Sequence, residues 1–266
     1  MYRIIKRIQV NIPFTMLYDT YLSLIIQHDI NPEIGLDAIA LDRFSISEYK
    51  DIAQKIHKQG LSITLHGPFM DLSPGSLDPK IRELTRYRFQ QVSQLIPIFL
   101  PKTVVCHTCY DNKRYAFLKE PWLQYSMELW SWFAESIKKE GAILLLENVY
   151  EHDPYEFLDL FKDLIGHGVG VCFDVGHQAV FSHENLDSWL GILGEYIVQL
   201  HLHDNHGIRD EHLPLGKGEI DFPRFFKCLK DKRIEPSVIT IEPHREEDLW
   251  PSLEYLESIW PWSWEF

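Results

Sequence analysis

The chain has 266 residues, of which 45% are hydrophobic, and its 39 acidic and 26 basic side chains give a formal charge of −13. This length and apolar content suffice for one large domain with its own core. Proteins that grip phosphate backbones usually carry a basic face, so the acidic balance speaks against nucleic acid as a partner.

The cysteine pattern and the absence of apolar targeting segments are typical of a protein of a reducing compartment. The four cysteines do not form the pattern of a disulfide framework. The first ten residues lack the apolar stretch of a signal peptide, and no run of residues approaches the length of a membrane span. We therefore expect a cytoplasmic location, with no membrane partner.

Short apolar segments alternate with longer helical patterns along the whole chain. Most are rich in leucine or β-branched residues and lack polar alternation, as parallel strands buried on both faces do. Eight such strands with intervening helices predict an α/β fold, a single (β/α)8 TIM barrel over residues 1–266. The predicted strands are Arg7–Ile12, Leu36–Leu41, Leu61–His66, Thr103–His107, Ala142–Glu147, Val169–Asp174, Ile197–His203 and Val238–Glu242.

Capping residues place helices in the gaps between these strands. Ser47 is the expected N-cap of a helix that runs to Gln59. Asp78, followed by a proline, should begin a second helix, which Pro97 should end or kink. A further apolar stripe over Pro154–Ile165 predicts another helix, whose inward face serves packing.

The connection Gly67–Leu77 is too long for a minimal turn between a strand and a helix. Two interpretations are equally open. The segment is either a lid or substrate loop, or a rigid surface loop held by its prolines.

The stretch Leu200–Gly218 is the richest in chemistry. His201 and His203 lie two residues apart on a predicted strand and should point to the same side. Asp210 and His212 have the same spacing in the loop that follows. Imidazole and carboxylate together suit zinc, manganese or iron. Strand histidines are also common as hydrogen-bonded core residues, so this stretch alone leaves both interpretations open.

Similar residues recur where other predicted strands end. In a parallel barrel all these ends open onto one face, where barrel enzymes place their chemistry. Several acids and imidazoles gathered there need a cation to coexist, because buried unpaired charge is costly. We therefore predict a divalent-metal site at this face. The residues are His66, His107, Glu147, Asp174, His177, His201, His203 and Glu242.

In this order the motifs resemble the xylose-isomerase-like TIM barrels, a superfamily that includes endonuclease IV and many sugar isomerases and epimerases. The resemblance covers essentially the whole chain. It is carried by His66-Gly67-Pro68, His107, Glu147-Asn148, Gly170–His177, His201–Asp204, Asp210–Gly216 and Ile241-Glu242.

The resemblance implies two alternative ligand sets. Sugar epimerases of the group hold one metal, which Glu147, Asp174, one of His201 and His203, and Glu242 would bind here. Endonuclease IV holds three zinc ions, and all nine of its ligand positions carry matching residue types. These positions are His66, His107, Glu147, Asp174, His177, His201, Asp210, His212 and Glu242. The spacing His-x-x-Asp favours His201 as the ligand, with His203 a candidate contact for substrate.

The sequence also departs from the endonuclease. Val175-Gly176 replaces the Thr-Cys pair before the histidine, Phe69 and Asp71 replace a tyrosine and an asparagine, and the segment between His201 and Asp210 is shorter. With the acidic charge, these departures speak against cleavage of DNA at abasic sites.

Hydrolysis of a phosphoester in a small substrate, such as a phosphorylated sugar, is the reaction that the full ligand set favours. Glu147 would bridge two ions that activate water, and Arg209 and Lys217 are the nearest cations for a phosphate. Zinc, up to three ions, is the expected cofactor, with manganese, iron and magnesium as alternatives.

Isomerisation or epimerisation of a sugar or sugar phosphate is the alternative. Glu147 and Glu242 would then move a proton beside a carbonyl, with His177 on a substrate hydroxyl. A third interpretation, a non-enzymatic binding protein with structural ions, fits a site at a barrel mouth poorly.

The C-terminal tail, from about residue 259, is unusually aromatic. Trp260, Trp262 and Trp264 alternate and would share one face of an extended segment. Packing on the chain's own barrel and a homodimer contact are both open.

Overall fold

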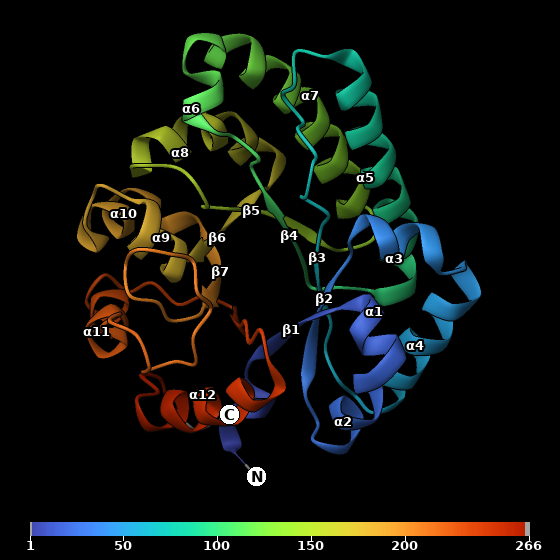
Figure 1. Cartoon of the computed structure of the whole chain (residues 1–266), viewed down its shortest axis with the longest axis vertical. Helices are drawn as coiled ribbons and strands as arrows, with labels where there is room; N and C mark the ends of the chain where they lie inside the picture. Colours follow the sequence, from blue (N-terminus) through green and yellow to red (C-terminus); the bar gives the residue numbers. More distant parts are fainter. Residues whose placement is uncertain (1, 264–266) are drawn as a thin grey trace.

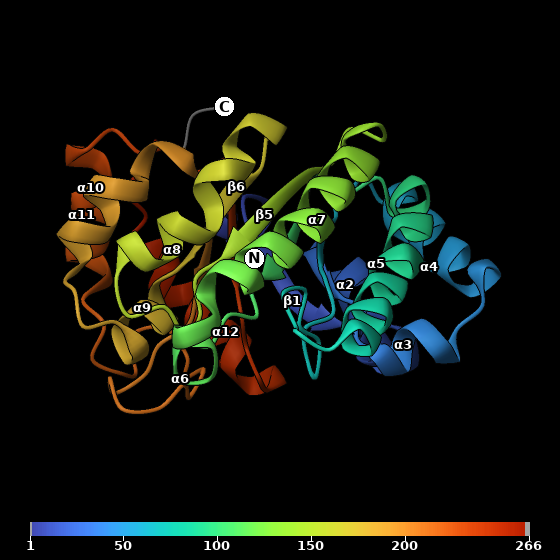
Figure 2. The same ribbon diagram turned by 90° about the horizontal axis from the view of Figure 1, so that it is seen from above.

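The computed structural model describes residues 2–263 and shows eight parallel strands closed into a barrel in chain order. Helices surround the strands (Figure 1; Figure 2 gives the view from above). The predicted single (β/α)8 TIM barrel is thus confirmed. The strands are β1 (Gln9–Pro13), β2 (Asn31–Gly35), β3 (Thr64–His66), β4 (Thr103–His107), β5 (Ile143–Glu147), β6 (Gly170–Asp174), β7 (Ile197–Leu202) and β8 (Val238–Ile241).

Helices of 8 to 21 residues form most of the outer layer, and shorter helical segments lie between them along the chain. They are α1 (Phe14–Met16), α2 (Leu22–Gln27), α3 (Ala38–Arg43), α4 (Ile46–Lys58), α5 (Pro79–Phe99), α6 (Asn112–Tyr115), α7 (Lys119–Lys138), α8 (Pro154–Phe161), α9 (Val175–Phe181), α10 (Leu186–Leu193), α11 (Phe222–Asp231) and α12 (Glu246–Ser258). A π-helical turn spans Leu17–Tyr21, and 3-10 turns span Arg3–Lys6, Ala116–Leu118, Lys162–His167 and Gly194–Tyr196.

The second strand is where the sequence prediction was wrong. The strand is Asn31–Gly35, and the segment predicted as a strand, Leu36–Leu41, forms a loop and the start of α3. Asparagine, proline and glutamate are depleted in strands, so local preference pointed to the leucine-rich segment that follows. Burial inside the barrel overrides that preference, and Glu33 at the centre of β2 is fully buried.

Two helix boundaries also differ from the prediction. The cap of α4 is Ser45, not Ser47, and it forms a reciprocal capping box with Glu48. Helix α5 begins after Asp78 as expected but continues through Pro97 to Phe99. Its C-cap is Leu100, whose backbone adopts a left-handed conformation.

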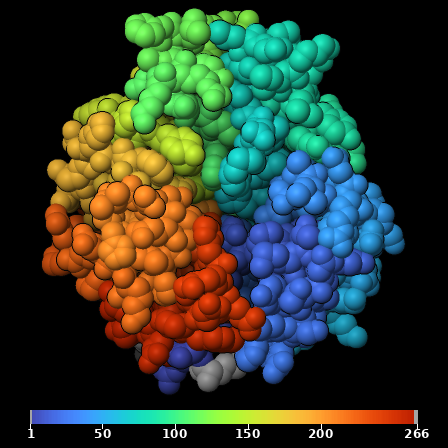
Figure 3. All heavy atoms as spheres, viewed as in Figure 1, coloured from blue at the N-terminus to red at the C-terminus, as the bar shows by residue number. Residues whose placement is uncertain are grey.

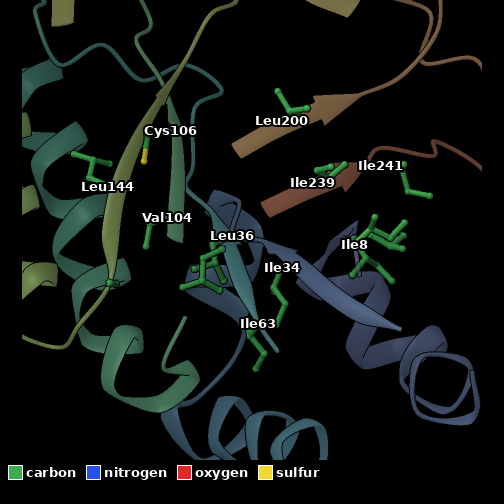
Figure 4. Packing of buried hydrophobic residues seen from close by; sticks show 14 of the residues in the cluster. Ile8, Ile34, Leu36, Ile63, Val104, Cys106, Leu144, Leu200, Ile239 and Ile241 are labelled. Atoms are coloured by element: carbon green, nitrogen blue, oxygen red, sulfur yellow. The ribbon is translucent and has the colours of Figure 1, made fainter. Parts of the chain in front are cut away.

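The main apolar core lies between the outer face of the barrel and the helices. Val104, Leu144 and Ile34 point outward from β4, β5 and β2 into this layer (Figure 4). Among the described residues, the apolar group packed inside the barrel is small and consists of Val105, Leu145 and Cys172, with Val198 against it. Because side chains of a strand alternate between its two faces, the interior also receives the polar residues that lead to the strand ends.

The aromatic tail packs in part on the chain's own barrel. The rings of Trp260 and Trp262 lie 4.9 Å apart, and Trp262 contacts Phe226 of α11 at 5.7 Å between ring centroids. Trp264 lies outside the described residues, so a homodimer contact through the tail stays a prediction. Within the described part of the chain, no helix combines the length and the apolar character needed to cross a bilayer.

A buried carboxyl group joins two loops at the carboxyl ends of the strands. Glu151 is 2% exposed and accepts hydrogen bonds from the Thr108 hydroxyl at 2.5 Å and from the Val149 backbone N–H at 2.8 Å. Burial raises the pKa of Glu151 to about 7, although these hydrogen bonds act in the opposite direction.

We expect the wild type to lose stability relative to Glu151→Gln between pH 4.5 and 7. In this range the unfolded chain ionises Glu151 and the folded chain does not, so rising pH favours unfolding until the folded pKa is passed. The difference should reach about 3 kcal/mol and then level off. Urea unfolding of both proteins across this pH range and about one unit beyond it, with chelator present, measures the difference. Parallel stability curves would contradict the assignment.

Candidate metal centre at the carboxyl ends of the strands

All nine residues of the larger predicted ligand set converge at one end of the barrel. Six come from strand ends, or directly after one: His66, His107, Glu147, Asp174, His201 and Glu242. His177 lies in the first turn of α9, and Asp210 and His212 lie in the loop between β7 and α11. Within several subsets, one ligand atom from each residue lies within 4.8 Å of the others.

The first subset is His66, His107 and Glu147. Both Nε2 atoms face the same carboxylate oxygen, Glu147 Oε2, at 3.2 and 3.5 Å. His66 Nδ1 lies 2.9 Å from the Gly67 carbonyl oxygen, which can only accept, so Nδ1 carries a proton and Nε2 is the nitrogen that faces Glu147. Burial lowers the pKa of His107 to about 3, against the charge of Glu147, so this imidazole is neutral.

The second subset surrounds His201. Its Nδ1 lies 3.1 Å from Glu242 Oε1 and 3.5 Å from Glu147 Oε1. Asp174, paired in register with His201, contributes a buried carboxylate beside them. His201 Nδ1 and Asp174 Oδ2 are buried and have no hydrogen-bond partner among the described residues. Buried polar atoms are nearly always satisfied, so two orphaned atoms beside two carboxylates indicate a ligand-binding position.

The third subset is His177, Asp210 and His212. The Nε2 atoms of both histidines lie 3.3 Å from Asp210 Oδ2. The Nδ1 atom of His177 lies 3.1 Å from the backbone carbonyl oxygen of Asn148. The Nδ1 atom of His212 lies 3.4 Å from the backbone carbonyl oxygen of Glu242. In both rings Nε2 is therefore the nitrogen that faces Asp210 and that would bind a cation.

The loop that carries Asp210 and His212 is held by a buried aspartate. Asp204, fully buried, accepts backbone N–H groups of Gly216, Gly218 and Ile220 at 2.8 to 3.2 Å. Its own backbone pairs in both directions with Leu213. These contacts fix the loop tightly enough to hold His212 at a φ of +49°, a conformation that costs free energy for a residue other than glycine.

Glu33 is a functional residue that the sequence analysis missed. Its Oε1 lies 2.9 Å from His201 Nε2, and Asn11, Thr64, Gln199 and Thr240 also donate to its two oxygens. Burial opposes ionisation, but the charge and hydrogen bond of His201 outweigh it and lower the pKa of Glu33. The carboxylate keeps the proton of His201 on Nε2 and so leaves Nδ1 as the ligand atom. The sequence analysis placed the second strand at Leu36–Leu41, so it did not predict that Glu33 points into the barrel.

His203 does not have the surface that a substrate contact would need. It is 1% exposed, and its ring stacks on His212 at 3.8 Å between centroids. Its Nε2 lies 3.1 Å from Asp174 Oδ1 and 3.6 Å from Asp210 Oδ1, so it orients both acids. Gly176 makes this possible, because a Cβ there would lie 2.0 Å from the His203 ring. The predicted contact of His203 with substrate finds no support in this geometry.

The cavity next to these residues has a volume of about 930 Å³. Figure 3 shows the molecular face hollowed where the blue N-terminal and red C-terminal segments approach each other. Glu147, Glu242 and His177, the predicted catalytic residues, all line it. Arg209 and Lys217 are exposed and do not line it, so their role in holding a phosphate stays a prediction. His244 lines it and stacks on His212 at 3.9 Å.

The charge of the centre fits divalent cations. Glu147, Asp174 and Glu33 are buried to 1% exposure or less, and Glu242 is 10% exposed at its side chain. Burial favours a neutral His177, yet the charges of Asp174, Asp210 and Glu147 raise the pKa of His177 well above its usual value. The site thus holds an excess of negative charge that protons compensate only in part, and imidazole with carboxylate is a donor set for zinc, manganese or iron.

A sequence profile described as the xylose isomerase-like TIM barrel matches residues 32–259. The chain belongs to this family, as the motifs predicted. Among curated proteins, MJ1311 of Methanocaldococcus jannaschii is 28% identical over 204 residues, 74% of this chain and 69% of its own length. MJ1188 of the same organism is 26% identical over 250 residues, 82% and 84% of the two chains.

Solved structures share the fold at lower identity. A D-tagatose 3-epimerase-like protein has a TM-score of 0.80 at 24% identity and covers 95% of this chain and 96% of its own. The D-psicose 3-epimerase of Clostridium cellulolyticum H10, solved with D-tagatose, scores 0.76 at 15% identity, with 95% and 98% covered. A protein of Thermus thermophilus, TTHB071, soaked with ZnCl2, scores 0.78 at 22% identity, with 96% and 98% covered.

The family match confirms the predicted class, an enzyme barrel of the xylose isomerase-like superfamily. The match does not favour phosphoester hydrolysis, the reaction that the full set of nine candidate ligands favoured in the sequence analysis. The solved neighbours whose descriptions state an activity are sugar epimerases.

Replacing Glu33 with glutamine should weaken metal binding about 10- to 100-fold, because the amide no longer fixes the tautomer of His201 as a carboxylate does. Competition with a chromophoric chelator measures the dissociation constant. Thr64→Val is the matched control, since it removes another buried partner of Glu33 without touching His201. Equal losses in the two variants would mean that Glu33 serves packing alone.

Proposed function

We propose that the protein is a divalent-metal-dependent isomerase or epimerase of a sugar or sugar phosphate. The observation that carries the proposal is the placement of Glu147 and Glu242. Their Oε1 atoms lie 3.5 and 3.1 Å from the same atom, His201 Nδ1, and both side chains line the cavity. The carboxylates of Glu147, at the end of β5, and Glu242, directly after β8, thus approach one point beside His201, where a cation could bind.

Glu147, Asp174, His201 and Glu242 would hold the cation. A bound divalent ion polarises a substrate carbonyl and so acidifies the neighbouring C–H bond. Burial opposes the charge of Glu147 and Glu242, but His201 outweighs it and lowers the pKa of both, so both carboxylates are ionised and able to accept a proton. Either could take the proton from the carbon beside the carbonyl, and the other, once it has taken up a proton from water, would deliver that proton to the same carbon.

His177 would assist at the same end of the cavity. Its Nδ1 is held by the Asn148 carbonyl, so the ring is fixed and its Nε2 edge faces Asp210 and the cavity. From there it can contact a substrate hydroxyl.

In D2O, the wild type should place one deuterium on the carbon whose configuration changes, because the proton passes through a carboxylate. Ketoses such as D-tagatose, D-psicose and D-fructose, and their phosphates, form the panel, followed by NMR. Glu242→Gln should lower kcat about 10²- to 10⁴-fold. Glu246→Gln, an exposed cavity residue outside the ligand set, should stay within about twofold. Turnover without deuterium uptake would refute the mechanism.

Hydrolysis of a phosphoester is the second candidate, and one observation favours it. A single-metal epimerase needs neither the pair His66 and His107 nor the group His177, Asp210 and His212 as ligands. Yet four of these histidines present Nε2 to a carboxylate oxygen at 3.2 to 3.5 Å.

Metal content and His107→Ala separate the two candidates. An epimerase should bind one ion at the second subset and keep most of its activity in the variant. A hydrolase should bind about three zinc ions per chain and lose its activity. Elemental analysis of protein prepared without a histidine tag gives the count. Three tightly held ions together with phosphate release would overturn our proposal in favour of hydrolysis.

A further inference from the structure

The cavity beside the metal centre has two unlike walls. One wall is the acidic and imidazole cluster on β3 to β8. The other is built by the N-terminal elements and the loop after β3, and its side chains are almost all apolar: Met16, Tyr21, Leu24, Ile39, Phe69 and Met70.

Several of these apolar side chains are exposed to the cavity and not packed in the core. Ile39 and Met70 are 68% and 70% exposed, and Met16 and Phe69 are 42% and 39% exposed. They come from three separate segments: α1, the start of α3 and the Gly67–Leu77 loop. Exposed apolar groups from unrelated segments that line one cavity usually mark a binding surface.

Phe69 connects the apolar wall with the metal centre. Its ring stacks on His107 at 4.1 Å and 23°, and it meets the edge of His66 at 5.6 Å. The two walls therefore form one continuous site, and a single ligand can contact both. The first part of the Gly67–Leu77 loop, from Gly67 to Leu72, thus lines the cavity beside the candidate metal centre.

Charge restricts what the apolar wall can hold. Among the described residues that line the cavity, Arg245 is the only lysine or arginine, and it is paired with Asp248 at 2.9 and 3.0 Å. Asp37 and Asp71 add negative charge on the apolar side. A phosphate or a nucleic-acid backbone would meet no free cation there. An uncharged apolar group meets only favourable surface.

We propose that the substrate is amphipathic: a hydroxylated or phosphorylated head at the metal centre carries an uncharged group of at least ring size, which packs on Met16, Ile39 and Met70. The sugar head rests on the proposed function; the apolar group does not. The volume of about 930 Å³ is at the upper end of pockets for drug-sized ligands, about 300 to 1,000 Å³, and exceeds what a free monosaccharide fills. Keto-sugars that carry an aryl, alkyl or ester group have this character.

The test compares methylphosphonate with benzylphosphonate on metal-loaded, full-length protein by calorimetry. Both heads bind divalent cations without turnover, so only the apolar group differs. We expect benzylphosphonate to bind at least about tenfold more tightly, as burial of a ring implies. The double variant Ile39→Ser, Met70→Ser should reduce this ratio below about threefold and leave methylphosphonate binding unchanged.

Ile208→Ser is the matched control, since Ile208 is 80% exposed on the β7–α11 loop and does not line the cavity. It should preserve the full ratio. Equal binding of the two phosphonates, or a preference that survives the double substitution, would overturn the apolar subsite. The deuterium experiment tests the sugar chemistry separately. If the protein prefers benzylphosphonate but catalyses no proton exchange, the apolar subsite is supported and the proposed function is contradicted.

Discussion

The architecture of the site depends on one buried carboxylate that is shared. Glu147, 1% exposed at the end of β5, lies within 3.5 Å of imidazole nitrogens from His66, His107, His177 and His201. A carboxylate so surrounded requires positive charge to remain ionised, and the excess of acids nearby means that imidazolium alone does not balance it. The strand ends, the anchored β7–α11 loop and the first turn of α9 are all arranged around this requirement.

The barrel interior beneath the site is polar for the same reason. Barrel interiors are usually filled with layers of branched apolar side chains. Here Gln199, Thr240, Thr64 and Asn11 surround Glu33, which in turn holds His201. A fixed imidazole presents its lone pair without the entropic cost of being ordered by the metal. Polar side chains thus replace apolar packing in this part of the barrel interior, and they hold His201 in the orientation that a metal ligand needs.

The two walls of the cavity come from different parts of the chain. The strands from β3 onward supply acids and imidazoles, whereas α1, α2 and the residues around α3 supply an apolar wall. A single cavity between them joins a site of high charge density with a surface that favours apolar groups. Specificity would then reside in the N-terminal segments, and chemistry in the rest of the barrel.

The sequence by itself determined the barrel and the residues that gather at its mouth. Seven of eight strands and the convergence of the nine candidate ligands could be predicted, because strand ends of a parallel barrel meet at one face and residues two apart share a side. The structure alone revealed β2, with Glu33, and the apolar side of the cavity. Strand β2 contradicts its local preferences and is stabilised by pairing with β1 and β3. The apolar wall joins segments distant in sequence, and their shared surface exists only once the barrel has closed, because no local pattern encodes which loops face each other.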